Sequence, residues 1–455
     1  MKSKLKNILH EDNFLSLIGN LAISLFGIVG FALLARSYKM EVFGEWVIFI
    51  SSAAFIEMFR FGIINTAIIR YLSGVDHEDR IRFIGSNGLI GVIASISISA
   101  ILFALHYIFY TPIHTSPYQL FFDWYPLLAL INLPLNTALV ILQADLKFGK
   151  ILFIRTLQSG GFFVILVANY FFFNLTLLQL VWAYVLIDVF TSVVCISKGW
   201  TGLRFIPMAD KKTISTLLNF SKYTTFTLIG TNLLRSADTF ILSFSPLGTA
   251  AVALYSIPMK LTELQQIPLR SFAATAFPKM SKASIQGKID EVKDVFYTYS
   301  GAMTFLFLFI SLFIFVFADL FVLILGGKHY IGTDPETGFN AATIMRIFTI
   351  YGILLPLDRM TGIGLDSVNK PNINFIKVLY MVIANIIGDL IAIFIFKSLD
   401  LVAVATIFFT LIGCWIGFHY LNKELTLEYK MIFTKGIEFY KMLYIKIMDL
   451  VQKKK

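Results

Sequence analysis

The sequence predicts an all-α integral membrane protein of about 12 transmembrane helices, arranged as two six-helix lobes around a central cavity, with cytoplasmic N- and C-termini. Three observations support this fold class. Hydrophobic residues make up 57% of the 455 residues and charged residues only 15%, against roughly 25% charged residues in a soluble domain. Apolar runs of about twenty residues, the length that crosses a bilayer as a helix, recur along almost the whole chain. Every second connecting segment is rich in basic residues, as in polytopic membrane proteins.

The apolar runs give the spans in order. The first run follows a polar, lysine-bearing start and is too long for the apolar core of a signal peptide, so we expect it to be a permanent span. The predicted spans cover residues 14–35, 46–65, 84–110, 120–143, 151–173, 177–197, 217–245, 250–277, 297–325, 341–366, 373–396 and 401–421.

The basic residues test this map independently, because lysine and arginine collect on the cytoplasmic side of a membrane protein. With the N-terminus placed inside, the outside loops hold only Arg36, Lys39, Lys328 and Lys397. Most of the 38 lysines and arginines fall in inside segments. A missed or invented span would destroy this alternation, so an even number of spans is expected.

The longest polar connection before the tail, residues 198–215, divides the map into six spans and six. We therefore expect an N-terminal lobe at 1–200 and a C-terminal lobe at 211–422. The second span of each half carries a similar acid-and-arginine element, which indicates an internal repeat of the kind common in transporters. The tail, 423–455, alternates lysines with apolar residues and is expected to be a cytoplasmic amphipathic helix on the anionic inner leaflet.

Ionisable residues inside the spans are the candidate functional residues, because a charge at mid-bilayer costs about 2.5–3.5 kcal/mol on insertion scales. The basic candidates, expected to line a cationic substrate-binding cavity, are Arg60, Arg235, Lys260, Arg270 and Arg346. The acidic candidates, for possible ion coupling, are Glu57, Asp188, Asp238, Glu263 and Asp389.

Two interpretations of these charges stay open. Three of the bases have an acid three residues away on the same helix face, so local ion pairs could simply fix the packing of the helices. The other interpretation is a water-filled cationic cavity that holds an anion, since the arginine fork can bind two phosphate oxygens at once. Arg270 and Arg346 favour the cavity, because neither has an acid at helical spacing.

Signatures of enzymes do not occur: the sequence has no HExxH motif, no Walker loop and no GxSxG motif. We therefore expect no enzymatic activity, no metal, no cofactor and no ATP hydrolysis by this chain alone. The net charge of +10 resides in the inside segments, which argues against a nucleic-acid partner. Cys195 and Cys414 lie inside apolar runs and are expected to be buried free thiols.

Several stretches resemble one known family. They are ADTFILSFSPLGTAAVALYSIPMKL followed by FPKMSKA, LLARSYKMEVFGEW, RFGIINTAIIRYLS, LILGGKHY and PLDRMTGIGLDSVNKPNINF. Together they resemble the polysaccharide and O-antigen flippase (Wzx-type) family of the MOP exporter superfamily, over nearly the whole chain. That superfamily also includes the multidrug/cation antiporters (MATE) and the lipid II flippases.

The resemblance implies two lobes that open alternately to each side of a bacterial inner membrane. It also implies that basic residues bind the pyrophosphate of an undecaprenyl-linked oligosaccharide, an O-antigen or capsule repeat unit. By position, Arg60 resembles the basic residue of the second span, and Arg235, Lys260 and Arg270 lie in the spans where the family also places cationic groups. Lipid II flippases have basic residues in the first span, but this chain has none there before Arg36.

The expected partners are a lipid-linked oligosaccharide diphosphate, membrane lipid and a glycan polymerase and chain-length complex. The alternative function is a multidrug/cation antiporter of the MATE type. That function would require an acid without a basic partner to bind cations, and Asp188 and Asp389 are the residues that could supply it.

Overall fold

The computed structural model describes residues 12–72, 76–335 and 337–452, and within those ranges the chain forms helices and no strand. The all-α prediction is therefore confirmed. The chain divides into two compact units, Met1–Asn232 (unit 1) and Leu233–Lys455 (unit 2). The division falls inside one long helix, α11 (Lys211–Ser243), whereas the sequence suggested the polar connection that precedes this helix.

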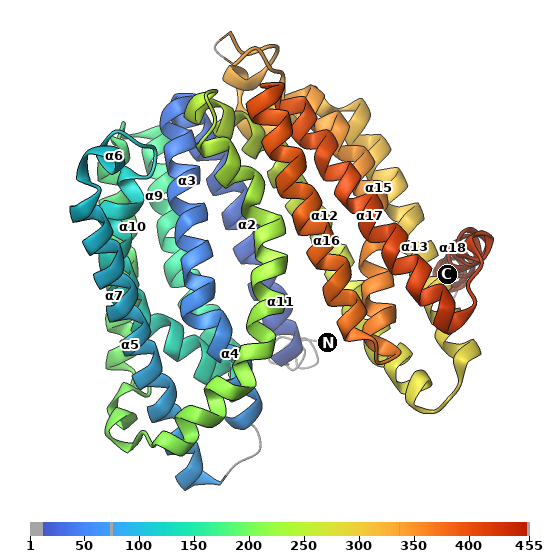
Figure 1. Cartoon of the computed structure of the whole chain (residues 1–455), viewed down its shortest axis with the longest axis horizontal. Coiled ribbons are helices and arrows are strands. Elements are labelled where there is room, and N and C mark those ends of the chain that lie inside the picture. The colour runs from blue at the N-terminus through green and yellow to red at the C-terminus, as the bar shows by residue number, and fades with distance from the viewer. Residues whose placement is uncertain (1–11, 73–75, 336, 453–455) are drawn as a thin grey trace. The chain divides into compact units, whose positions relative to one another are not determined.

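Unit 1 is a bundle of long helices joined by short connections (Figure 1). Its elements before α11 are α2 (Asp12–Ser37), α3 (Met40–Glu57), η1 (Met58–Gly62), α4 (Ile63–Leu72), α5 (His77–Ile108), α6 (Tyr110–His114), α7 (Gln119–Ala144), α8 (Phe148–Arg155), η2 (Thr156–Gly160), α9 (Gly161–Phe171), α10 (Leu177–Ser197) and η3 (Leu203–Met208). Segments η1 and η2 are π-helical turns, and they join their neighbours into longer continuous helices.

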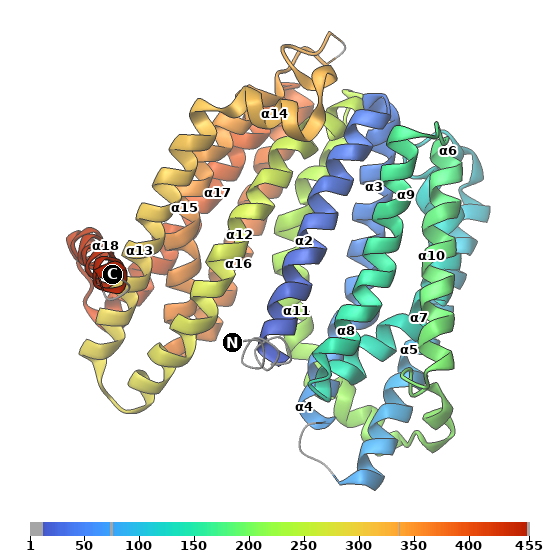
Figure 2. The ribbon, with the colours of Figure 1, turned by 180° about the vertical axis from the view of Figure 1, so that it is seen from behind.

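Unit 2 is also a bundle, with one further helix packed on its side (Figure 2). Its elements after α11 are α12 (Gly248–Ile285), α13 (Ile289–Val316), α14 (Ala318–Gly326), η4 (Lys328–Tyr330), α15 (Ala341–Ser367), α16 (Pro371–Leu390), η5 (Ile391–Ile395), α17 (Leu399–Leu425) and α18 (Tyr429–Gln452). Segment η5 is a third π-helical turn.

Every predicted span coincides with helical residues. In the part of the chain that the structure describes, nine helices are long and apolar enough to cross a membrane, and Ile23–Ser37, the second part of α2, is a shorter apolar stretch. The integral membrane prediction is confirmed, while the number of twelve spans remains a prediction. Helix α12 has 38 residues, more than enough to cross, yet it is too polar to be among the nine.

Helix starts follow from side chains that satisfy the free N–H groups of the first turn. Helix α10 begins with a capping box made by Thr176 and Gln179. The side chains of Asn340 and Ser398 accept hydrogen bonds from the first turns of α15 and α17. Pro371 begins α16, where its missing N–H costs nothing.

Glycines on α5 bring other segments close to this helix. A Cβ at Gly85 would collide with the carbonyl of Phe205, and one at Gly88 would press on the side chain of Ile206. Both contacts come from η3, so the polar connection after α10 folds back onto α5 instead of hanging free. Small residues that let backbones approach closely are typical of membrane helix packing.

The C-terminal helix α18 belongs to unit 2 and packs against α13 (Figures 1 and 2). The two helices touch at Gly301 and Gly436, where a Cβ on either residue would meet the backbone of the other helix. Both views show α18 nearly end-on beside α13, so α18 crosses α13 at a steep angle.

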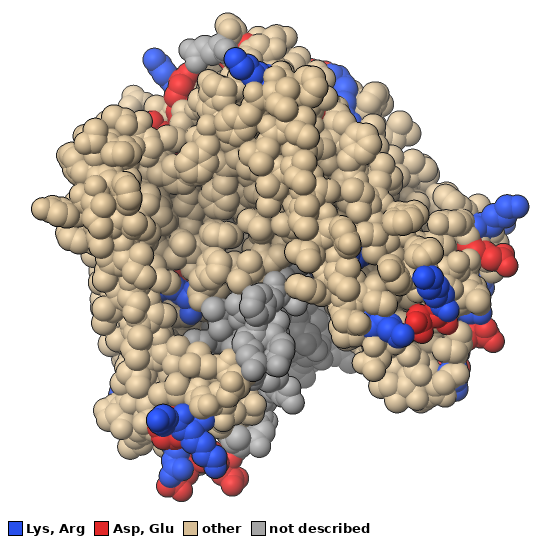
Figure 3. Space-filling view, in the orientation of Figure 1, with Lys and Arg blue, Asp and Glu red and all other residues tan. Residues whose placement is uncertain are grey.

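Charged side chains gather near the ends of the helices, and most of the surface of each unit between those ends is free of charge in the view of Figure 3. This pattern is the one expected of helices that cross the apolar interior of a bilayer.

Candidate functional site

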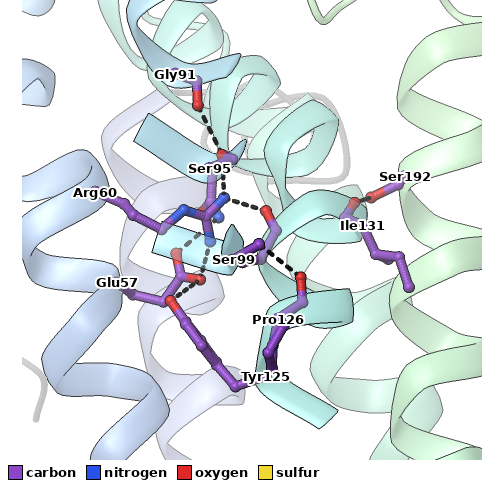
Figure 4. Close-up of polar contacts among 11 residues, drawn as sticks. Glu57, Arg60, Gly91, Ser95, Ser99, Tyr125, Pro126, Ile131 and Ser192 are labelled. Atoms are coloured by element: carbon purple, nitrogen blue, oxygen red, sulfur yellow. Dashed lines mark hydrogen bonds and ion pairs between the residues drawn. The ribbon is translucent and has the colours of Figure 1, made fainter. Parts of the chain in front are cut away.

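Arg60 is the centre of a buried polar cluster in unit 1. It lies in the π-helical turn η1, and only 1% of its surface is exposed. Its guanidinium donates to the carboxylate of Glu57, to Ser95 Oγ at 2.8 Å and to the backbone carbonyl of Ala129 (Figure 4). Arg60 is therefore bound by its own unit on three sides.

The partner carboxylate of Glu57 is held from the other side as well. The hydroxyl of Tyr125 donates to Glu57 Oε1 at 2.9 Å (Figure 4), and Asn136 Nδ2 lies 3.4 Å from Glu57 Oε2. For Arg60, this geometry supports the interpretation of an ion pair that fixes helix packing.

Asp188 on α10 is the second buried acid of unit 1, with no exposed surface. Its Oδ1 accepts a hydrogen bond from Gln158 Nε2 at 2.8 Å, and Gln158 belongs to the π-helical turn η2. Oxygens Asp188 Oδ2 and Asn132 Oδ1 are buried and have no hydrogen-bond partner among the described residues. No lysine or arginine side chain that the structure describes forms an ion pair with Asp188.

Unit 2 contains a pair of buried carboxyl groups, Asp238 on α11 and Asp389 on α16, exposed by 5% and 0%. Asn385 Nδ2 donates to both, at 3.1 Å to Asp238 Oδ1 and 3.0 Å to Asp389 Oδ2. The hydroxyl of Tyr255 donates to Asp238 Oδ2 at 2.9 Å. Oxygens Asp389 Oδ1 and Asn385 Oδ1 are buried without a partner among the described residues.

This acid pair requires a positive charge to be stable when both groups are ionised, because two neighbouring carboxylates in a low-dielectric site repel each other. No described basic side chain forms an ion pair with either group. A shared proton or a small cation held by the unpartnered oxygens would satisfy the site.

Helix α12 carries a stripe of charged residues on an accessible face. Lys260 Nζ lies 2.8 Å from Glu263 Oε2, and these side chains are 24% and 39% exposed. Arg270, two turns further along, is exposed. The predicted partner of Asp238, Arg235, has a side chain outside the described residues.

Arg346 is paired, contrary to what its neighbours in the sequence suggested. Its Nη2 lies 2.6 Å from Asp319 Oδ2, and its Nε contacts the carbonyl of Phe315 at 3.4 Å. Asp319 comes from α14, a different helix, so helical spacing could not reveal it. The pair is partly exposed, 34% and 57%, and lies near the start of α15.

Lys377 is a buried charge that is not among the candidates predicted from the sequence. It is 2% exposed, and its Nζ lies 2.7 Å from both the carboxylate and the backbone carbonyl of Asp358. Two glycines leave space for the Lys377 side chain, because a Cβ at Gly362 or Gly417 would approach it within 3.5 Å. The available signal was its position within the predicted span 373–396.

The buried amides Gln158 and Asn385 were also missed as partners of the acids. Their signal was an amide inside an otherwise apolar run. The three π-helical turns lie beside the same groups: Glu57 precedes η1, Gln158 is within η2, and Asp389 precedes η5. Such turns frequently occur at functional sites.

Known proteins resemble this chain in sequence, through a family model, and in structure, through solved transporters. Residues 9–284, more than half of the chain, match the family of polysaccharide biosynthesis proteins. None of the curated proteins matches the sequence.

Solved structures of transporters share the fold. An inward-facing multidrug resistance MATE family transporter of the MOP superfamily has a TM-score of 0.72 and 14% identity, over 89% of this chain and 98% of that one. The lipid II flippase MurJ has a TM-score of 0.68 and 14% identity, over 96% of this chain and 93% of that one. A MOP superfamily transporter from Pyrococcus furiosus has a TM-score of 0.59 and 14% identity, over 91% of this chain and 93% of that one.

At this level of identity the structural likeness establishes the fold, and the sequence match establishes the family. The resemblance seen in the sequence motifs is thereby confirmed. The chain belongs to the polysaccharide biosynthesis protein family and has the fold of the MOP-superfamily transporters.

Proposed function

We propose that this chain is a flippase of the bacterial inner membrane that moves an undecaprenyl-diphosphate-linked oligosaccharide from the inner to the outer leaflet by alternating access. The family and the fold support a membrane exporter of the polysaccharide branch. The proposed cargo is an O-antigen or capsule repeat unit, whose diphosphate carries the negative charge.

The single observation that carries this proposal is the polar face of α12. The helix has 38 residues but lacks the apolar window of a lipid-facing span, and Lys260, Glu263 and Arg270 are accessible on it. A charge facing hydrocarbon is costly, and intramembrane charges therefore face a bundle interior or a water-filled path. Helix α12 accordingly lines the hydrated route that a sugar and a diphosphate require.

Within this route we assign the diphosphate to Lys260 and Arg270. Arg60 is only 1% exposed and is bound to Glu57, and Arg346 pairs with Asp319 on other helices, whereas Lys260 and Arg270 share the accessible polar face of α12. Arginine and lysine stabilise phosphate through charge-assisted hydrogen bonds, which contribute about 1.5–3 kcal/mol each.

We further propose that buried acids couple transport to an ion. Oxygens of Asp389, Asn385, Asp188 and Asn132 have no hydrogen-bond partner among the residues that the structure describes, and a proton or a monovalent cation would satisfy them. An inside-negative membrane potential adds about 2.3 kcal/mol per charge per 100 mV in favour of outward anion movement.

The test uses the purified protein in liposomes that contain a fluorescent undecaprenyl-diphosphate oligosaccharide. Translocation is measured as the change in accessibility of this lipid to a membrane-impermeant reagent. We expect the Lys260→Gln/Arg270→Gln double variant to translocate the lipid at least about 100-fold more slowly, because it loses two charge-assisted hydrogen bonds to the diphosphate, about 1.5–3 kcal/mol each. Lys279→Gln is the matched control, since Lys279 lies on the same helix but near its end and contacts Tyr299. Wild-type translocation by the double variant would refute the assignment of the diphosphate to α12.

A multidrug/cation antiporter of the MATE type is the second candidate, favoured by the buried Asp188 without a basic partner among the described residues. It predicts cation-coupled export of a fluorescent dye from the same liposomes, lost in Asp188→Asn. Dye export without translocation of the lipid-linked oligosaccharide would establish this alternative.

A further inference from the structure

An apolar groove runs between α13 and α18 on the surface of unit 2. Its volume is about 330 Å³. The residues that line it are Phe305, Phe309, Ile437, Tyr440, Lys441 and Tyr444. Phe309, Ile437 and Tyr444 are 68%, 47% and 65% exposed, so the groove is open along its length.

The groove has fixed walls, because α18 is fastened to α13 at several points. Backbones touch at Gly301 and Gly436, and the hydroxyl of Tyr440 donates to the carbonyl of Ala302 at 2.8 Å. Lys435 Nζ lies 2.9 Å from Asp294 Oδ1. Hydrogen bonds from Lys435 to Asp294 and Glu438 raise the pKa of this lysine, so Lys435 stays protonated and its ion pair with Asp294 is kept.

On α13 the groove lies along the apolar second half of the helix. Helix α13 starts with Asp290 and Glu291, while its second half is almost wholly apolar. Phe305 and Phe309 lie four and eight residues beyond Gly301, or about 6 and 12 Å deeper along the helix at 1.5 Å per residue. Helix α18 crosses α13 at Gly301, seven residues beyond Asp294, the last charged residue of α13.

The lining of the groove includes one basic side chain, that of Lys441. Lys441 lines the groove and is exposed, and no carboxylate among the described residues forms an ion pair with it. Along α18, basic residues outnumber acidic ones. A steeply crossing, basic, amphipathic helix at the edge of the apolar zone is the arrangement of an interfacial helix.

We propose that the groove binds one acyl chain of an anionic glycerophospholipid, with the lipid phosphate on Lys441. The aromatic rings of Phe305, Phe309 and Tyr444 contact the acyl chain, and the ammonium group of Lys441 binds the phosphate of the headgroup. An anionic lipid matches the charge of the helix, which a neutral lipid does not, and cytoplasmic leaflets are rich in anionic lipids. The site lies on the outer face of α13 and α18 and is separate from the proposed cargo route along α12.

The experiment uses the full chain in phosphatidylcholine vesicles that contain phosphatidylglycerol with a photoreactive group in one acyl chain. We expect crosslinks on Phe305–Phe309 and Ile437–Tyr444, competed by unlabelled phosphatidylglycerol and not by phosphatidylcholine. Lys441→Gln should lower the labelling about fivefold, the effect of one basic residue on attraction to an anionic surface. Lys430→Gln, an exposed lysine of the same helix outside the groove, should leave the labelling unchanged, and Ile437→Trp should abolish it by filling the groove.

Three results would overturn the proposal. Equal competition by phosphatidylcholine would mean ordinary contact with bulk lipid. Equal loss of labelling in Lys430→Gln and Lys441→Gln would mean a diffuse attraction to the helix. Stronger competition by undecaprenyl phosphate than by phosphatidylglycerol would assign the groove to the prenyl chain of the cargo.

Discussion

Replacing Arg60 with methionine tests whether the buried pair in unit 1 is structural. The change removes the guanidinium from Glu57, Ser95 and the carbonyl of Ala129 while keeping an unbranched apolar side chain in its place. Glu57 retains Tyr125, a neutral donor. An acid without its counter-charge then remains in the interior.

The expected cost follows from burial. Breaking a buried ion pair by removing one partner costs about 3–5 kcal/mol, and Glu57, with a quarter of its side chain exposed, places the value near the lower limit. At about 2–4 °C per kcal/mol for a unit of this size, the unfolding midpoint should fall by roughly 10 °C. The Glu57→Gln/Arg60→Met double variant should recover part of the loss, because it leaves no buried charge.

The assay is thermal unfolding of the purified chain in detergent, together with translocation measured in liposomes. Lys260→Met is the matched control for stability, since Lys260 and Glu263 form the same three-residue spacing on an accessible face. Partly exposed pairs contribute about 0–1 kcal/mol, so this midpoint should hardly move. The reasoning is refuted if Arg60→Met unfolds like the wild type and yet no longer translocates the lipid, because Arg60 would then bind cargo.

Three further outcomes are expected. Asp389→Asn should make translocation independent of sodium and proton gradients, measured with each gradient imposed in turn, and a retained response to a gradient would exclude the acid pair as the coupling site. Gly436→Leu should detach α18 from α13, since a Cβ there meets the α13 backbone, and limited proteolysis after the α17–α18 connection should accelerate; unchanged proteolysis would contradict the close crossing. Partial burial of Asp145 is outweighed by its hydrogen bonds from Lys147 and Arg80, which hold the pKa of this carboxyl below its usual value. A lowered pKa stabilises the folded state above the unfolded pKa of about 3.9, so the midpoint difference between wild type and Asp145→Asn should be present at pH 7 and vanish as the pH falls through the lowered pKa; a difference that persists in acid would refute the pair.

The membrane spans could be predicted because each depends only on the local run of residues along the sequence. A run of apolar residues long enough to cross a bilayer is visible without any tertiary information, and each predicted span coincides with a helix. The buried acids were visible for the same reason, since a charge inside such a run stands out. Asp188 and Asp389 were identified from that signal alone and are fully buried.

The pairing of the charges was not predictable, because it depends on which helices touch. Helical spacing reveals partners three or four residues away, which is how Lys260 and Glu263 were matched. It could not connect Arg346 with Asp319 or Lys377 with Asp358, which lie on different helices. The accessible candidates could be separated from the buried ones only once the packing was known.

The three π-helical turns mark places where the chain can lose one residue without turning the rest of the helix. A π-turn holds one residue more than the corresponding α-turn, so removing a single residue from 58–62, 156–160 or 391–395 would let the helix close as a regular α-helix. The residues beyond the deletion would then keep roughly their present orientation, whereas a one-residue deletion from a regular α-helical stretch rotates everything beyond it by about 100°. Deletions of one residue at these places should therefore do less harm than the same deletion elsewhere in a span, and related chains can differ by one residue in the length of these turns.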